Sequence, residues 1–395
     1  MDHAELATLL TPEALRLLDG LGPIDSTDDV AAAVTRLRAA GVAPDLVSAV
    51  VGQARLRSRA AAKFGPFAAR MLFTRAGLEQ ASRLSMAARH AGRFRDAGVA
   101  RVADLGCGIG GDALGFAGIG LDVLAVDADE VTAAIAAYNL APFGTAAEVR
   151  HSRAEETDLA GVDAVWLDPA RRSAGHGETR RTRPEDWTPS LEWAFDLARR
   201  MPTGIKLGPG LDRAAIPADV EAQWITVDGS TIELVLWSGA LTRPGVTRAA
   251  LVVHGDAAHE LTAPADAEDV PVRGLGAYVH EPAGAVIRAR LIGEVARRLD
   301  AGMLADGIAY LTSDTDRTSP FVQSFRIREE LPFDVKRLGR ALRERGIGTL
   351  EIKKRGVDVD PAALRPQLKL TGDGSATLLL TKIAGARVAL LADRV

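Results

Sequence analysis

Four glycines lie within six residues of the stretch VADLGCGIGGD (residues 102–112), directly after a short apolar run and before a segment typical of a helix. Glycine lets the backbone pass close to a ligand and turn sharply into a helix N-terminus. Asp127 ends the next apolar run, 21 residues beyond Gly106. A carboxylate at that position can accept hydrogen bonds from both hydroxyls of a ribose. The loop and this acid together predict a nucleoside-binding site.

The kind of nucleoside depends on Asp104, which lies two residues before the first glycine. Gly106, Gly108 and Gly111 satisfy the G-x-G-x-x-G pattern of a nicotinamide or flavin dinucleotide site, so that class stays open, as does a purely structural glycine-rich turn. A carboxylate at residue 104 would repel a pyrophosphate but attract the amino group and sulfonium of S-adenosylmethionine, which is the cofactor we expect. The predicted cofactor-binding residues are Asp104, Gly106, Gly108, Gly110, Asp127 and Glu155, the last as an acceptor for the adenine amino group.

A second candidate site lies in VWLDPARRS (residues 165–173), where an apolar run ends at Asp168 and Pro169 follows. The exocyclic amine of a nucleobase is a poor nucleophile because its lone pair is delocalised into the ring. A carboxylate and a carbonyl that accept its N–H groups would point the lone pair at a methyl donor, and proline has no N–H to compete for them. Arg171 and Arg172 would hold a phosphate or a base edge. The alternative is a strand end with a turn-forming Asp-Pro and solvated arginines.

The chain has one cysteine, Cys107, and seven scattered histidines. A single cysteine excludes an internal disulfide and a thiolate metal cluster, and the histidines form no His-x-x-x-His pair, so we expect no metal. Methylation of a pyrimidine at carbon 5 needs a cysteine nucleophile near the base. Because Cys107 lies in the glycine loop, on the donor side, the sequence argues against that reaction.

The elements that must position these residues fall into three predicted regions. Residues 1–95 have helical patterns throughout. Residues 96–265 alternate short valine-rich apolar runs with helical segments, which predicts an α/β domain whose Rossmann-like, mainly parallel sheet is covered by helices. Residues 270–395 form a separate α+β unit, in which LKLTGDGSATLLLTKI (368–383) resembles a hairpin that turns at Gly372-Asp373-Gly374.

The formal net charge of −4 conceals two basic regions. Residues 55–101 contain eleven Lys/Arg against Glu79 and Asp96, and residues 317–355 contain eleven against five acids. Two basic islands in a mildly acidic chain favour an anionic polymer as partner, although solvated helix surfaces would have the same composition. No apolar run reaches the length of a membrane span and the N-terminus lacks a secretory pattern, so we expect a cytoplasmic protein that does not bind membranes.

The motifs DLGCGIGGD, AVDAD and DPAR resemble those of Rossmann-fold, S-adenosylmethionine-dependent methyltransferases. The upstream segment LFTRAGLEQAS (72–82) is similar to the one that folds over the cofactor in trimethylguanosine synthase-like enzymes. FTRAGLEQA (73–81), DPARR (168–172) and YVHEP (278–282) are similar to the pattern of bacterial methyltransferases with a C-terminal THUMP-like domain. The resemblance covers residues 55–395, and its motifs taken together are specific to this subfamily.

This resemblance implies an enzyme that methylates a base nitrogen in structured RNA, such as tRNA or rRNA, with the THUMP-like unit binding the RNA. Lys206, in GIKLGPG, would lie at the mouth of the site and contact the substrate. Trimethylguanosine synthases carry an aromatic residue after paired prolines, which stacks on guanine, whereas this chain has Ala170 and Arg171. Stacking would then come from the guanidinium of Arg171, or from Phe73 or Trp187.

The C-terminal basic region has two interpretations. The stretch IKKRG (352–356), with Arg337, Arg340 and Arg343 before it, favours phosphate contact, while an oligomerisation or lid domain is the alternative. Two other functions also stay open for the whole chain: a methyltransferase for a small metabolite or a protein, and a non-catalytic RNA-binding factor that keeps the donor pocket for stability.

Overall fold

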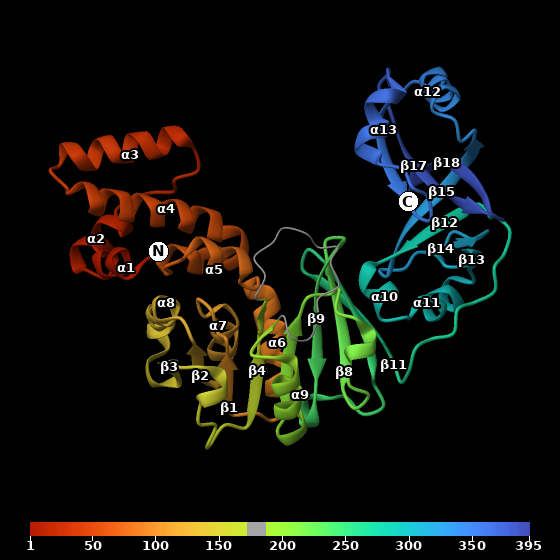
Figure 1. The fold of residues 1–395 in the computed structure, drawn as a ribbon. Helices are drawn as coiled ribbons and strands as arrows, with labels where there is room; N and C mark the ends of the chain where they lie inside the picture. Colours follow the sequence, from red (N-terminus) through yellow and green to blue (C-terminus); the bar gives the residue numbers. More distant parts are fainter. Residues whose placement is uncertain (172–186) are drawn as a thin grey trace. The chain divides into compact units, whose positions relative to one another are not determined.

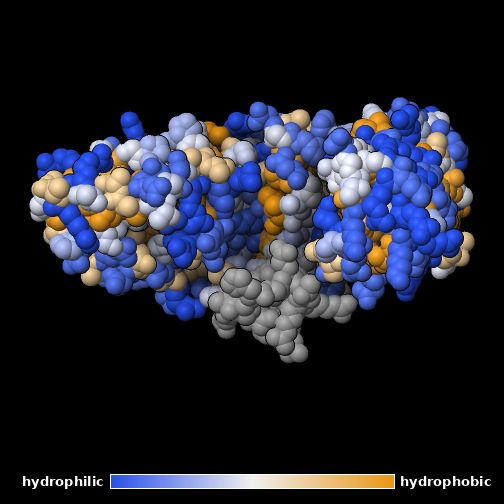
Figure 2. Space-filling view, turned by 90° about the horizontal axis from the view of Figure 1, so that it is seen from above, coloured by the Kyte–Doolittle hydropathy of each residue, from blue (hydrophilic) through white to orange (hydrophobic). Residues whose placement is uncertain are grey.

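The computed structural model describes residues 1–171 and 187–395 (Figure 1). Its residues form two compact units, one of Met1–Val220 with Leu236–Thr242, the other of Glu221–Val235 with Arg243–Val395. Hydrophilic residues cover much of the face drawn in Figure 2, with apolar residues in smaller groups between them. Among the described residues, no helix combines the length and the apolar character that crossing a membrane requires.

The N-terminal helices follow local signals in the sequence. Thr11 caps a helix that has Pro12 as its first residue, accepting a hydrogen bond from the backbone N–H of Ala14 at 3.2 Å. Ser26 and Asp29 form a capping box at the start of the next one. The predicted helical character of this region is confirmed. Its helices are α1 (His3–Leu9), α2 (Pro12–Asp19), α3 (Thr27–Ala39), α4 (Pro44–Phe64), the 3₁₀ helix η1 (Gly65–Arg70), α5 (Arg75–Gln80) and α6 (Leu84–Asp96).

Parallel strands form the centre of the first unit, in the order β7-β4-β1-β2-β3. Each neighbouring pair in this order is parallel, so the carboxyl ends of these strands lie at one edge. The predicted Rossmann-like sheet is therefore confirmed. The strands are β1 (Arg101–Leu105), β2 (Asp122–Asp127), β3 (Ala147–His151), β4 (Ala164–Leu167) and β7 (Thr203–Leu207). The helices between them are α7 (Gly111–Gly118), α8 (Glu130–Leu140) and α9 (Leu191–Arg200).

Aromatic side chains hold β4 in this sheet. Trp166 is fully buried, and its ring centroid lies 5.8–6.2 Å from those of Trp237, Phe94 and Phe116. Gly204 on β7 faces the same ring, and a Cβ at that position would lie 2.8 Å from it. Only glycine lets the two strands approach this closely. The aromatic cluster thus fixes the strand whose end carries the candidate acceptor residues.

The second unit begins with β8 (Glu221–Val227), which lies between β10 (Arg248–His254) and β9 (Ser230–Trp237). Strands β8 and β9 are joined through Asp228-Gly229, whose φ angles of 47° and 83° match a type I′ turn. Strand β10 runs parallel to β8 and antiparallel to β11 (Ala257–Ala263).

The C-terminal sheet has the strand order β13-β14-β12-β15-β18-β17-β16. Its strands are β12 (Tyr278–Pro282), β13 (Gly302–Ala305), β14 (Ile308–Ser313), β15 (Val322–Leu331), β16 (Ile347–Lys354), β17 (Gly374–Ile383) and β18 (Ala386–Arg394). Its helices are α10 (Gly284–Arg288), α11 (Ile292–Leu299), α12 (Val335–Glu344) and α13 (Pro361–Leu368). The predicted α+β character of this region is confirmed.

The predicted hairpin at Gly372-Asp373-Gly374 is wrong. Strands β16 and β17 are parallel, and the antiparallel hairpin is instead β17–β18. The physical reason is that α13 connects the two parallel strands, and its Leu364 and Leu368 enter the core with Leu338 and Leu378. A parallel pair needs such a crossover, which a tight turn cannot supply.

Candidate active site

The glycine loop and the DPAR motif meet at the carboxyl edge of the parallel sheet. Leu105 of β1 pairs with Val126 of β2 on one side and with Leu167 of β4 on the other. The residues that follow these strands are therefore neighbours. A Cβ on Gly106 would lie 3.1 Å from the backbone carbonyl oxygen of Asp168, which shows how closely the two segments approach.

The loop after β1 has the backbone that its glycines permit. Gly106, Gly108 and Gly110 have φ angles of 86°, 56° and 87°, a region that L side chains rarely adopt. The backbone N–H of Gly108 donates to Asp127 Oδ2 at 2.9 Å, and that of Asp129 donates to Oδ1 at 2.9 Å. Burial raises the pKa of Asp127. Each of its oxygens keeps a second lone pair with which it can accept a ribose hydroxyl.

Asp104 lies at the base of this loop and is almost fully buried. Neither of its carboxylate oxygens has a hydrogen-bond partner among the described residues. Burial raises the pKa of Asp104 well above its ordinary value, and the nearby charges of Asp112 and Asp168 raise it further. A buried carboxyl without a partner is costly, so the site fits a cationic group such as the amino group of S-adenosylmethionine.

Lys206 on β7 occupies a different place from the one expected. Its Nζ lies 2.6 Å from Asp168 Oδ2 and 3.3 Å from Asp112 Oδ2, and it donates to Ser82 Oγ at 2.9 Å. The side chain of Lys206 is only about a tenth exposed. It therefore lies between the acceptor motif and the helix that follows the glycine loop, and does not project from the mouth of the site.

Asp112, in the first turn of α7, is the carboxylate that the sequence interpretation missed, although it ends the motif GIGGD. It accepts a hydrogen bond from Ser82 Oγ at 2.9 Å, and its other oxygen lies 3.0 Å from His90 Nδ1. Burial alone would raise the pKa of Asp112, but the charge of Lys206 and the contact with His90 outweigh it and leave the pKa below its ordinary value. Asp112 is therefore a buried anion that anchors the lysine.

The segment before α6 is held against the glycine loop by buried amides. The side chain of Asn139 accepts from the N–H of Leu72 at 2.8 Å and donates to the carbonyls of Leu72 and Ile109 at 3.0 and 2.9 Å. A Cβ on Gly77 would lie 2.5 Å from Cγ2 of Ile109, so α5 touches the loop directly. The segment that the sequence predicts to fold over the cofactor thus contacts the glycine loop, and its contact with a cofactor stays a prediction.

The remaining predicted residues are spread around this edge. Ala170 and Arg171 form β5, which pairs antiparallel with β6 (Trp187–Thr188), and Arg172 lies outside the described residues. Glu155, in the 3₁₀ turn η3 (Ala154–Glu156), pairs with Arg153 at 3.2 Å. Of the three stacking candidates, the rings of Phe73 and Trp187 are buried, so neither is accessible to a base in this structure.

The cysteine of the glycine loop is enclosed by the fold. Cys107 is buried, and burial raises the pKa of its thiol well above the ordinary value. Within residues 1–171 and 187–395, the structure contains no group of three or more His, Cys, Asp or Glu side chains that could hold a metal ion.

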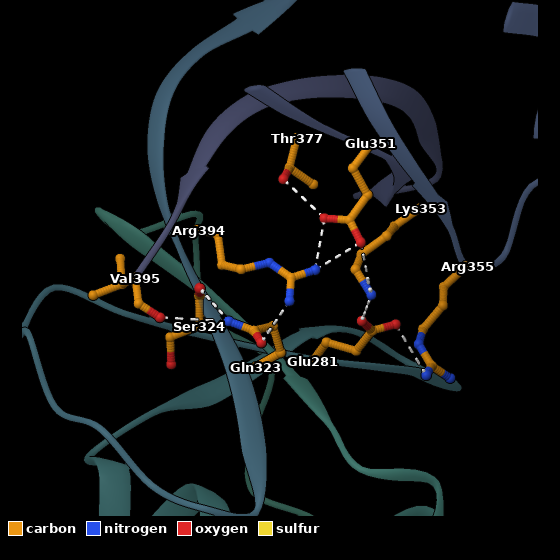
Figure 3. Close-up of polar contacts among 9 residues, drawn as sticks. All are labelled: Glu281, Gln323, Ser324, Glu351, Lys353, Arg355, Thr377, Arg394 and Val395. Carbon is orange, nitrogen blue, oxygen red and sulfur yellow. Dashed lines mark hydrogen bonds and ion pairs between the residues drawn. The ribbon is translucent and has the colours of Figure 1, made fainter. Parts of the chain in front are cut away.

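In the C-terminal unit, ion pairs occupy much of the basic stretch 352–356 (Figure 3). Lys353 and Arg355 contact the two carboxylate oxygens of Glu281 at 2.5 and 3.3 Å. Glu351 accepts from Arg394 at 2.7 and 2.8 Å. These side chains tie β16 to β12 and β18. Two of the three cations in this stretch therefore have an acidic partner within the fold, and the expectation that the stretch contacts phosphate stays a prediction.

The helix before β16 keeps more of its charge on the surface. Arg343 of α12 donates to the carbonyl of Leu368 at 2.6 Å and so helps to hold α13. Lys336, Arg337 and Arg340 of the same helix are exposed and have no acidic partner among the described residues. α12 thus carries three exposed cations that a phosphate could contact, and Lys354 of β16 is also exposed.

Comparisons with known proteins connect this geometry to named families. A family model described as "THUMP domain-like" matches residues 322–394, and one described as a domain of unknown function matches residues 2–60. A protein of Mycobacterium tuberculosis, named an uncharacterized S-adenosylmethionine-dependent methyltransferase, is 34% identical over 339 residues, which are 83% of this chain and 90% of that protein. The same match is found in two strains of that organism.

A solved structure shares the fold over nearly the whole chain. The crystal structure named "putative methyltransferase" from Porphyromonas gingivalis W83 superposes with a TM-score of 0.70 at 20% sequence identity. The match covers 94% of this chain and 99% of that one. The fold of this chain is therefore one that occurs in an experimental structure.

Proposed function

This chain belongs to the S-adenosylmethionine-dependent methyltransferases, and we propose that it methylates a base nitrogen in structured RNA, such as tRNA or rRNA. Its cofactor is S-adenosylmethionine. The observation that carries the proposal is the approach of Gly106 to Asp168, since it sets the acceptor motif beside the loop that would hold the donor. The THUMP domain-like match over residues 322–394 supports RNA as the substrate class.

The donor would be held by the loop after β1 and the end of β2. Asp104, whose buried oxygens lack partners among the described residues, would accept the donor's amino group. Asp127, already oriented by the backbone N–H of Gly108, would accept the ribose hydroxyls. Glu155 would accept the adenine amino group, and the backbone of Gly106, Gly108 and Gly110 would leave room for the ligand. When bound, S-adenosylmethionine supplies the methyl group.

The acceptor amine would be oriented by Asp168 and Pro169. The carboxylate and the proline carbonyl accept the N–H groups and turn the nitrogen lone pair toward the methyl carbon. Lys206, 2.6 Å from Asp168 Oδ2, holds that oxygen in position. Arg171 and Arg172 would contact phosphate or a base edge. Positioning of this kind raises the reaction rate because the nitrogen and the methyl carbon are already held in line for the transfer.

The test is mass spectrometry of nucleosides from total tRNA and rRNA of the source cell, with and without the gene. We expect one methylated nucleoside to disappear on deletion, to return with the wild-type gene, and to stay absent with Asp168→Asn. If every RNA modification persists in the deletion strain, the RNA assignment is wrong. If Asp168→Asn restores the nucleoside as well as wild type does, the assignment of Asp168 is wrong.

A further inference from the structure

The eleven basic side chains of residues 55–101 divide into two groups in the structure. Several are occupied by internal partners. Arg57 pairs with Asp19 at 2.9 Å, and Lys63 donates to three backbone carbonyls at the C-terminal end of α5, each at 2.8 Å. Burial lowers the pKa of Lys63, and the charges of Lys206 and Arg83 lower it further. These occupied cations serve the fold and are not available to a ligand.

A second group of five arginines is exposed and has no acidic partner among the described residues. These are Arg55, Arg59, Arg70, Arg75 and Arg83. They follow one another on α4, η1, α5 and the N-cap of α6. Phe67, on η1, is 54% exposed and is the large hydrophobic side chain that the described part of this region leaves in solvent. We call these six residues the arginine surface.

The elements that carry the arginine surface are joined rigidly. Lys63 connects the end of α4 to the end of α5. The buried amide of Gln53 donates to the carbonyl of Phe73 at 2.6 Å and accepts from its N–H at 3.1 Å. Arg57 Nε donates to the carbonyl of Met71 at 2.9 Å. The arginines are therefore presented on a framework whose shape is set before any ligand binds, which reduces the entropy cost of binding.

The same framework lies against the predicted donor loop. Gly77 of α5 approaches Ile109 of the loop closely enough that a Cβ would lie 2.5 Å from its Cγ2. Ser82, the residue before Arg83, donates to Asp112 at 2.9 Å and accepts from Lys206. Arg75 lies two residues before Gly77, and Arg83 follows Ser82. A polyanion bound at these two arginines would thus lie beside the residues that would carry out methyl transfer.

We propose that the arginine surface binds the phosphate backbone of the RNA substrate next to the methyl-donor loop, with Phe67 stacking on an unpaired base. This inference rests on the proposed function and adds a contact surface outside the THUMP-like unit. Arginine binds phosphate oxygens in a bidentate geometry, and five unpaired guanidinium groups give a local field that favours a polyanion. Phe67 is close in the chain to the exposed Arg70, and an exposed aromatic ring can stack on a base of single-stranded or looped RNA.

The test measures the affinity of the full-length protein for fluorescently labelled bulk tRNA as a function of salt. The variant Arg55→Gln/Arg59→Gln removes two cations from the surface, and Arg36→Gln/Arg38→Gln, on the exposed side of α3, is the matched control. Each lost phosphate contact lowers the slope of log affinity against log salt by about 0.7–0.9, so the first variant should lose about 1.5 from the slope. The control should keep the wild-type slope.

Two further measurements make the outcome unambiguous. Calorimetry with S-adenosylhomocysteine should give the same affinity for both variants and wild type, because neither changes the donor loop. Phe67→Ala should weaken binding of a single-stranded RNA at least about fivefold with an unchanged salt slope, since stacking releases no counterions. Leu10→Ala, which removes another exposed apolar side chain, should have no effect.

The possible failures can be told apart. If Arg55→Gln/Arg59→Gln and its control have the same salt slope while wild type binds tRNA, the proposal that the arginine surface binds RNA is wrong and the proposed function is unaffected. If wild type itself shows no salt-dependent affinity for tRNA, both the surface and the RNA assignment are wrong. A loss of slope in the Arg55/Arg59 variant alone supports the surface.

Discussion

Replacing Lys206 with methionine tests the charge balance of the candidate active site. The substitution keeps the volume of the side chain but removes the ammonium that contacts Asp112 at 3.3 Å and Asp168 at 2.6 Å. Removing one partner of a buried ion pair costs about 3–5 kcal/mol because the other charge is left without compensation. The Asp112 side chain is 7% exposed and bears most of this cost, whereas that of Asp168 is 36% exposed and is partly screened by solvent.

The expected loss of stability lies at the lower end of that range. Asp112 keeps its contacts with Ser82 and His90, so we expect Lys206→Met to reduce the free energy of unfolding by about 3 kcal/mol. For a unit of this size the loss corresponds to a decrease of about 6–12 °C in Tm. Scanning calorimetry of wild type and variant measures it. The double variant Lys206→Met/Asp112→Asn should recover much of the loss, because an amide can be buried without a counter-ion.

The pH dependence gives a second, independent readout. In wild type the pKa of Asp112 is below its unfolded value, so its stabilising contribution is present above the unfolded pKa and is lost as pH falls through the folded pKa. Without Lys206, burial dominates and the pKa of Asp112 rises. The deficit of the variant should therefore grow between pH 4 and pH 7 and shrink as pH falls below 4. A deficit below about 1 kcal/mol, or one that does not change with pH, would refute the charge-balance argument.

Three other predictions concern single positions. Asp104→Asn should stabilise the ligand-free protein at pH 7, because the pKa of Asp104 is raised in the folded state and stability is lost as pH rises through that folded pKa. The same variant should bind S-adenosylhomocysteine about 10- to 100-fold more weakly by calorimetry, since hydrogen bonds to charged groups contribute about 1.5–3 kcal/mol. Gly106→Ala should weaken donor binding and lower Tm more than Gly41→Ala. Both glycines have positive φ, but only at Gly106 would the added Cβ lie close to a carbonyl oxygen, 3.1 Å from that of Asp168. Equal effects of the two substitutions would contradict this. Burial lowers the pKa of His280 to about 4, so the wild-type protein should lose about 3 kcal/mol of stability as pH falls from 7 to 4, through the unfolded pKa. His280→Gln has no group that titrates in this range and should not show that loss. An unchanged pH profile by thermal unfolding would argue against this.

Several features of the site were predictable from the sequence because they depend on neighbours along the chain. The glycine loop follows β1 directly, Asp127 ends β2 and Asp168 follows β4, and the carboxyl ends of parallel strands must meet at one edge. The alternation of strand patterns with helical patterns was sufficient to predict the Rossmann-like sheet. The helical N-terminal region was predictable for the same reason, since its caps are local signals.

Other features depend on contacts that the sequence does not encode locally. The hairpin predicted at 372–374 failed because α13 has to cross between two parallel strands, and the packing of Leu364 and Leu368 in the core decides this. The basic stretch 352–356 looked available to phosphate, yet Glu281, some seventy residues earlier, binds two of its cations. Charge counts give the number of cations but not their partners.

The sequence by itself determined the fold class and the cofactor class and predicted one edge of the sheet as the candidate site, because strand periodicity, glycine spacing and the acids at strand ends are properties of short segments. Tertiary structure alone decided that Lys206 contacts Asp168 and Asp112, and which arginines stay exposed. An ion pair between residues 94 positions apart exists only once two strands and a helix have packed, and whether a cation is available to RNA depends on the carboxylates and carbonyls that packing brings to it.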